Sequence, residues 1–119
     1  MQLQGIFTNA KWHDICALDD IVAGTGVAAR LNGEQLAVFN TGNGIFAIGN
    51  LDPFSGANVL ARGLLGDIAG VLVVASPVYK QHFCLQTGRC LEDPEISVPA
   101  YQVRVCEITN RILIRAYTE

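Results

Sequence analysis

The chain has 119 residues, which is enough for one compact domain and too few for two. Half of the residues are hydrophobic and only 16% are charged, a composition that excludes a disordered tail. The net charge is -3 and the eight lysines and arginines form no basic run, so a nucleic-acid partner held by charge is also excluded.

The first part of the chain predicts short strands joined by tight turns. Residues 26–31 and 34–39 flank Asn32-Gly33, a pair that supplies the two positive φ angles of a type I′ turn, so they predict a hairpin. A second turn at 41–44 leads into a short buried strand at 45–48.

The middle of the chain is less regular. Residues 50–70 contain a proline and four glycines, so we expect an irregular stretch with a helical turn within 57–65. Residues 71–75 are all apolar and predict a fully buried strand. A further strand at 81–85 is expected to meet a turn at 86–89.

The last segment shows the clearest pattern. Tyr101, Val103 and Val105 alternate with more polar residues, and a turn at Thr109-Asn110 separates them from a second arm at 111–117. A period of two in both arms predicts an antiparallel hairpin. Short strands at a spacing of about 8–12 residues, without a sustained helical period, predict an all-β sandwich or small barrel.

The apolar residues are not arranged for a membrane. The longest apolar run, residues 71–75, is far shorter than the roughly 20 residues of a spanning helix. Residues 1–14 lack the basic start and apolar stretch of a signal peptide, so we expect a cytoplasmic protein with reduced cysteines in its core. The apolar excess then indicates a deep core and a surface that meets another protein.

Two local patterns have competing interpretations. Residues 42–47 match the dinucleotide-binding pattern G-x-G-x-x-A, but a strand follows where that motif needs a helix, so a turn is favoured. His82, Cys84 and Cys90 form an H-x-C-x5-C pattern with three soft ligands and no paired C-x-x-C spacing. Core thiols are therefore favoured, and a thiol- or metal-binding module remains the alternative.

Two segments resemble the cluster loops of Rieske iron–sulfur proteins. Residues 47–57 resemble the first loop, which reads roughly C-P-H-x-G-A, and residues 76–90 resemble the second, C-P-x-H-G-x-x-F-x-L-x-T-G. The prolines, the glycines, the Phe-x-Leu strand and the Thr-Gly turn are in register. The resemblance implies a Rieske-like antiparallel β-sandwich of short strands, with two convergent loops.

The four ligand positions of those loops hold other residues. A Rieske cluster is bound by two cysteines on one iron and two histidines on the other. Asp52 and Ser76 stand at the cysteine positions, and Phe54 and Tyr79 at the histidine positions. Hard oxygen donors replace thiolates poorly, and a phenyl ring offers no lone pair. The resemblance therefore implies a scaffold without its cluster, and no metal, cofactor or catalytic residue in this chain.

This combination resembles the small subunit of the assimilatory NAD(P)H-dependent nitrite reductase. The similarity covers about residues 10–116, which leaves residues 1–10 as an extension and 11–119 as a single domain. The resemblance implies an accessory, non-catalytic and cytoplasmic subunit. Its partner would be the large subunit, which carries FAD, an iron–sulfur cluster and sirohaem and reduces nitrite to ammonia. An electron-carrying Rieske-type ferredoxin or oxygenase component is the alternative that the missing ligands disfavour.

The tip formed by the two loops is the expected contact with that partner. It would be stiff and largely apolar, and aromatic anchors with a polar rim are typical of binding hot spots. Alternatively, the aromatic side chains at the two histidine positions fill the space of the cluster inside the domain. The candidate docking residues, which we call the loop tip, are Pro53, Phe54, Pro77, Val78, Tyr79 and Lys80.

Overall fold

The computed structural model describes residues 11–115, and this part of the chain is built almost entirely from strands. The all-β prediction is confirmed. The predicted extension, residues 1–10, lies outside the described residues, as do the last two residues of the strand predicted at 111–117. The elements are β1 (His13–Ala17), β2 (Thr25–Leu31), β3 (Glu34–Asn40), β4 (Ile45–Gly49), β5 (Leu51–Asp52), β6 (Ala57–Asn58), β7 (Leu64–Ile68), β8 (Val71–Ala75), β9 (His82–Cys84), β10 (Ala100–Cys106) and β11 (Arg111–Arg115), with short 3-10 helices η1 (Leu18–Asp20) and η2 (Leu60–Arg62).

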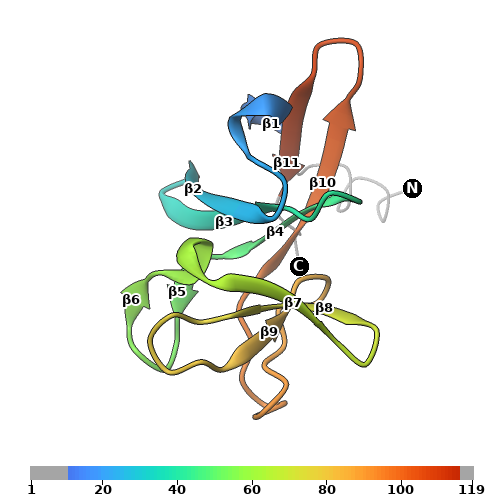
Figure 1. Cartoon of the computed structure of the whole chain (residues 1–119). Helices are drawn as coiled ribbons and strands as arrows, with labels where there is room; N and C mark the ends of the chain where they lie inside the picture. The colour runs from blue at the N-terminus through green and yellow to red at the C-terminus, as the bar shows by residue number, and fades with distance from the viewer. Residues whose placement is uncertain (1–10, 116–119) are drawn as a thin grey trace, which may run out of the picture.

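A six-stranded antiparallel sheet forms one half of the domain, in the order β1-β11-β10-β4-β3-β2 (Figure 1). The predicted β2–β3 hairpin is confirmed, because Asn32 and Gly33 adopt positive φ angles of 53° and 85° and Leu31 pairs with Glu34. The two ends of the sheet approach each other, since β1 also lies against β2. The sheet therefore curls toward a barrel around its own apolar core.

The predicted C-terminal hairpin is also confirmed. Tyr101, Val103 and Val105 of β10 pack on the core of the large sheet together with Ile112 and Ile114 of β11. The alternating residues of both strands therefore lie on the opposite face. Strand β1, which the sequence analysis did not predict, pairs with β11 through an irregular register near residues 14–16. This irregularity interrupts the alternation of apolar and polar residues in β1, so the sequence shows no strand pattern there.

A smaller sheet, β7-β8-β9, forms the other half and corrects two predictions (Figure 1). Residues 64–68 were expected to be irregular, but they form β7 and pair with β8 from Leu64–Ala75 to Ile68–Val71. The turn between them uses positive φ angles at Ala69 (52°) and Gly70 (87°). An alanine in this conformation carries no turn signal, so the hairpin was missed. The helical turn predicted within 57–65 is confined to η2.

Strand β8 is present as predicted, but it is not fully buried. Val73 and Val74 are buried, whereas Val71 and Leu72 are 38% and 37% exposed. The pairing explains this difference, because β9 covers only the second half of β8, from Val73 to Ala75. The turn end of the β7–β8 hairpin therefore reaches beyond the core.

The two predicted loops connect the halves of the domain. The first runs from β5 through β6, and the second follows β8 and leads into β9. A second apolar core lies beneath them and includes Phe39, Leu60, Val74 and Phe83. Within residues 11–115, neither helix is long and apolar enough to cross a membrane.

Gly63 tests how closely η2 is packed against β8. A Cβ added at Gly63 would overlap the backbone carbonyl of Ala75 and the side chain of Val74. We expect Gly63→Ala to lower the free energy of unfolding by about 2 kcal/mol or more, because close-packed backbone has no room to relax. Thermal unfolding followed by circular dichroism would measure the loss.

Gly66 provides a matched control for this substitution. It lies in the neighbouring strand β7, where an added Cβ would meet nothing closer than 3.9 Å, at the side chain of Val73. Gly66→Ala should change stability by no more than about 0.5 kcal/mol, or raise it through the reduced entropy of the unfolded chain. Equal losses in the two variants would contradict the close approach of η2 to β8.

Candidate functional site

Asp52 and Ser76, the residues at the two cysteine positions, are brought into direct contact. Both are fully buried, and the Ser76 hydroxyl donates a hydrogen bond to Asp52 Oδ2 at 2.5 Å. The two residues are 24 positions apart, one in each loop. The loops therefore converge as predicted, and a short hydrogen bond of charge-assisted length joins them.

Each partner of this hydrogen bond also closes its own loop. Asp52 Oδ1 accepts the backbone N–H of Phe54 at 2.8 Å, and the Asp52 carbonyl accepts that of Gly56 at 2.7 Å. A positive φ of 75° at Gly56 returns the chain to β6, where Ala57 pairs with Asp52. The aspartate thus shapes the first loop by a local turn that its short side chain favours.

Ser76 has the corresponding role in the second loop. Its hydroxyl oxygen accepts the Val78 N–H at 3.3 Å, and its carbonyl accepts the Lys80 N–H at 3.1 Å. Its own N–H donates to the Gln81 carbonyl at 2.9 Å. Lys80 has a φ of 69°, a left-handed conformation. It stands where the pattern C-P-x-H-G has its glycine, so this glycine is not in register, and the register predicted from the sequence holds only for the other glycines. The backbone turn of the pattern is therefore retained without the residue that favours it.

These residues do not fit a [2Fe–2S] cluster. The oxygens of Asp52 and Ser76 are bonded to each other, so no space for an iron lies between them. The Phe54 ring is packed on the core beneath the loops, 6.2 Å from the Phe83 ring centroid, while Tyr79 is 60% exposed. The four positions therefore supply neither soft donors nor a common centre.

The two aromatic residues at the histidine positions, Phe54 and Tyr79, differ in burial. Phe54 is partly buried and packs against the core, which agrees with filling of the former cluster space. Tyr79 lies outside that core, exposed like its neighbour Val78. Phe54→Ala is consequently expected to disturb the fold. The sequence analysis had left core filling and docking open for this residue, and its packing agrees with core filling.

His82, Cys84 and Cys90 do not form a metal site. His82 Nδ1 lies 2.6 Å from Glu92 Oε2, and the His82 backbone N–H donates to Glu92 Oε1 at 2.8 Å. Within residues 11–115, no group of three or more His, Cys, Asp or Glu side chains is arranged to hold a metal ion. Desolvation disfavours the charged form of Glu92, but the hydrogen bonds from His82 outweigh it and lower the pKa of this carboxyl.

The four cysteines are free thiols, but only Cys90 is buried, and the other three are partly exposed. The expected core position is therefore correct for one of the four. Burial is the largest cause that raises the pKa of Cys90. For Cys84, desolvation is outweighed by hydrogen bonds with Thr87 and Gln86 and by the charge of Arg89, so its pKa is lowered. These two thiols flank the turn that follows β9: Cys84 ends the strand, and its N–H donates to the Arg89 carbonyl at 2.9 Å, next to Cys90.

Asn50 supports the first loop and was not recognised in the sequence. It is buried, its Oδ1 accepts the Ala61 N–H at 2.7 Å, and its Nδ2 donates to Gln35 Oε1 at 3.0 Å. The amide therefore connects η2 to β3 just before Asp52. Its position two residues before the Asp-Pro-Phe segment could have drawn attention to it, although a polar residue beside a turn is usually exposed.

Comparison with known proteins agrees with this geometry. Residues 11–114 match the family model of the Rieske-like [2Fe-2S] domain. The chain is 49% identical over 98 residues to the nitrite reductase (NADH) small subunit of Salmonella typhimurium, covering 81% of this chain and 91% of that protein. The crystal structure of a Mycobacterium tuberculosis protein, proposed to be an NADH-dependent nitrite reductase small subunit, superposes with a TM-score of 0.86 at 42% identity, covering 92% of this chain and 98% of that one.

Two further relatives place the domain in other contexts. A 94-residue match at 47% identity, 79% of this chain, is found in the nitrite reductase [NAD(P)H] large subunit of Klebsiella oxytoca, where it makes up 10% of that protein. The ferredoxin of carbazole 1,9a-dioxygenase from Nocardioides aromaticivorans superposes with a TM-score of 0.73 at 26% identity, covering 87% of this chain and 96% of that one. A similar scaffold therefore occurs in proteins of different function.

Ser76→Ala should expose the energetic role of the contact between the loops. The substitution leaves a buried carboxyl oxygen of Asp52 without its donor, so we expect the free energy of unfolding to fall by about 2–3 kcal/mol. Urea unfolding of the single variants Ser76→Ala and Asp52→Asn and of the double variant would give the coupling energy between the two side chains.

Ser55→Ala is the matched control in the same loop region. Among residues 11–115, Ser55 Oγ accepts only a local N–H, from Ala57 at 3.3 Å, and the residue is partly exposed. This substitution should cost less than about 1 kcal/mol. If Ser76→Ala costs no more than Ser55→Ala, or if the coupling to Asp52 is zero, the buried hydrogen bond does not stabilise the loops.

Proposed function

The chain belongs to the Rieske-like [2Fe-2S] domain family and, within it, to the small subunits of nitrite reductase, and we propose that it is the accessory, cluster-free small subunit of an enzyme that reduces nitrite to ammonia with NAD(P)H. The observation that carries this proposal is the Asp52–Ser76 hydrogen bond. Because the side chains at the two cysteine positions hydrogen-bond to each other and connect the loops, we assign no electron-carrying centre to this chain.

The chemistry of the complex then belongs to the large subunit. Transfer of electrons from NAD(P)H to nitrite needs redox groups, and we assign FAD, an iron–sulfur cluster and sirohaem to that partner. Residues 11–119 would form the single domain of the accessory subunit. A cytoplasmic location agrees with the free thiols of all four cysteines.

The relative from Klebsiella oxytoca supports the large subunit as the partner. There, a segment that is 47% identical to this chain is part of the large-subunit polypeptide itself. A covalent connection keeps a domain at a high effective concentration beside its partner. The same pair of domains as separate chains must instead associate through complementary surfaces.

The loop tip is the surface we propose for that association. Tyr79 and Val78 are 60% and 44% exposed, and Pro53 and Pro77 are exposed beside them. The internal hydrogen bonds of Asp52 and Ser76 hold the backbone of both loops, so little conformational freedom is lost on binding. Lys80 adds a positive charge to the edge of this apolar surface.

Tyr79→Ala should weaken binding to the large subunit by about tenfold or more while leaving thermal stability nearly unchanged, because the exposed ring contributes to the interface and not to the core. Isothermal titration calorimetry with the purified large subunit would measure the affinity. Ile108→Ala is the matched control, since Ile108 is 95% exposed in the distant β10–β11 turn. Equal affinity of both variants and the wild type would exclude the loop tip.

Activity tests the function as a whole. The large subunit produced with this chain should oxidise NAD(P)H in the presence of nitrite and form ammonia faster, or remain active longer, than the large subunit alone. The isolated chain should be inactive and colourless. Stoichiometric iron and sulfide in folded, isolated chain would overturn the cluster-free assignment, and identical activity with and without the chain would overturn the accessory role.

A further inference from the structure

A second surface of the domain combines one tryptophan with two arginines. The guanidinium carbons of Arg104 and Arg115 lie 4.5 Å and 4.6 Å from the ring centroid of Trp12. Arg104 belongs to β10 and Arg115 to β11, on the face of the large sheet that points away from its core. We call Trp12, Arg104 and Arg115 the arginine–tryptophan surface.

The two arginines of this surface differ from the neighbouring Arg111 in having no ion pair with a carboxylate of residues 11–115. Arg111, on the same strand as Arg115, is neutralised by an ion pair of 2.9 Å with Asp14. Neither Arg104 nor Arg115 forms an ion pair with any carboxylate of residues 11–115. Their guanidinium groups instead pack on the indole of Trp12. This cation–π contact leaves most of the guanidinium N–H groups available for other partners.

The arginine side chains are held in place before any partner binds. Arg115 Nε donates to Gln102 Oε1 at 2.5 Å, and both guanidinium groups are positioned by the indole. A shallow depression of about 430 Å³ lies over Trp12 and the two arginines. Side chains already ordered in this way lose less entropy on binding, and tryptophan and arginine are the residues most enriched in binding hot spots.

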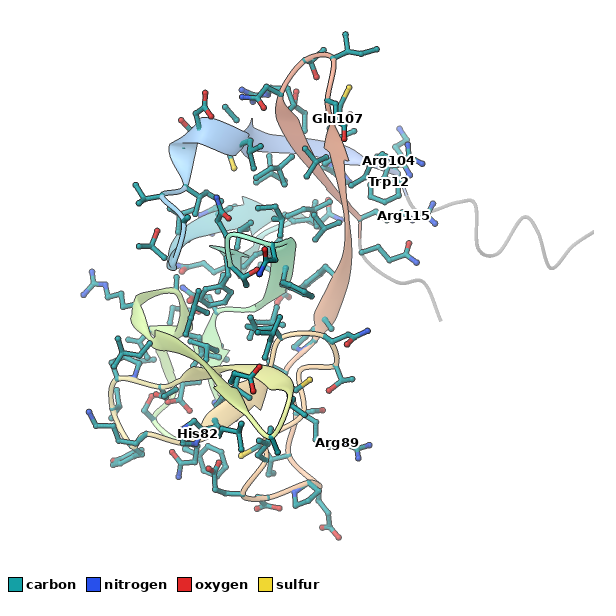
Figure 2. All side chains as sticks on the ribbon, turned by 45° about the vertical axis from the view of Figure 1, so that its right-hand side comes forward. Trp12, His82, Arg89, Arg104, Glu107 and Arg115 are labelled. Atoms are coloured by element: carbon teal, nitrogen blue, oxygen red, sulfur yellow. The ribbon has the colours of Figure 1, made fainter. Side chains whose placement is uncertain are left out.

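Figure 2 shows where this surface lies in the molecule. Trp12, Arg104 and Arg115 gather along the large sheet, whereas His82 and Arg89 lie at the opposite end, in the segment that follows the loop tip. The surface is therefore separate from the loop tip. It is locally positive in a protein whose net charge is -3, so its charge is a local feature of the β10–β11 face and not a general property.

We propose that the arginine–tryptophan surface binds an acidic segment of the nitrite reductase large subunit, as a second contact independent of the loop tip. This inference rests on the proposed function. The ligand chemistry is a pair of carboxylates, because each guanidinium presents a planar fork that matches a carboxylate and no carboxylate of residues 11–115 fills it. A nucleic acid is a poorer occupant, since phosphate backbones need a longer basic surface than two arginines provide.

The test compares two double charge reversals in binding to the purified large subunit by biolayer interferometry. Arg104→Glu with Arg115→Glu should raise Kd about tenfold or more and reduce its dependence on NaCl concentration. Arg30→Glu with Arg62→Glu makes the same change of charge at exposed arginines elsewhere and should stay within about threefold of wild type. Arg104→Lys with Arg115→Lys should give an intermediate affinity, because the charge remains and the fork is lost.

Several outcomes would overturn the proposal. Equal affinity of the two charge-reversed variants would mean that Arg104 and Arg115 have no specific role. Sedimentation of the chain alone tests a different occupant: a dimer that dissociates only when Arg104 and Arg115 are reversed, with unchanged affinity for the large subunit, would assign the surface to a second copy of this chain.

The same experiment separates this inference from the proposed function. Wild-type chain that does not bind the large subunit at all would overturn both. Wild-type binding that is weakened by Tyr79→Ala and not by reversal of Arg104 and Arg115 would leave the proposed function standing and overturn only the second contact. Thermal unfolding of each variant confirms that a loss of affinity is not a loss of folding.

Discussion

Two buried oxygen atoms, 2.5 Å apart, hold the two loops of this domain together. In a Rieske protein the same positions carry thiolates that share an iron, and coordinate bonds cross-link the loops. A hydrogen bond stabilises the loops far less than such coordinate bonds do, by about 1–3 kcal/mol when one partner is charged or buried. Contacts with the core under the loops must therefore supply the remaining stability. The Phe54 ring on the core and the Asn50 bridge to η2 supply that support.

The hydrogen bond between Asp52 and Ser76 connects the two loops without a redox-active metal. Asp52 and Ser76 point inward and shape both turns, which leaves the outward residues of the loops free of any ligand role. Tyr79 and Val78 are exposed on a backbone that is already ordered, the condition under which an apolar surface binds with least entropic cost. The loop tip thus has the ordered, exposed apolar side chains that the proposed contact with a partner requires.

Local pattern accounted for the strands whose pairing is also local. The β2–β3 and β10–β11 hairpins follow from Asn32-Gly33 and from alternation, because neighbouring residues fix both the turn and the register. Strand β7 and the exposure of Val71 did not follow. The first depends on a turn at Ala69-Gly70 without a typical signal, and the second on how far β9 extends along β8.

For the site, the sequence by itself determined that the loops lack the ligand set of a Rieske cluster, because an aspartate, a serine and two aromatic rings supply neither thiolate nor imidazole. It also determined that residues of both loops belong together, through their register with a known pattern. Only the tertiary structure decided that Asp52 and Ser76 bond to each other, that Phe54 turns inward while Tyr79 turns outward, and that Trp12 meets Arg104 and Arg115. These contacts join residues far apart in the chain, so packing of the whole domain sets them and no local pattern encodes them.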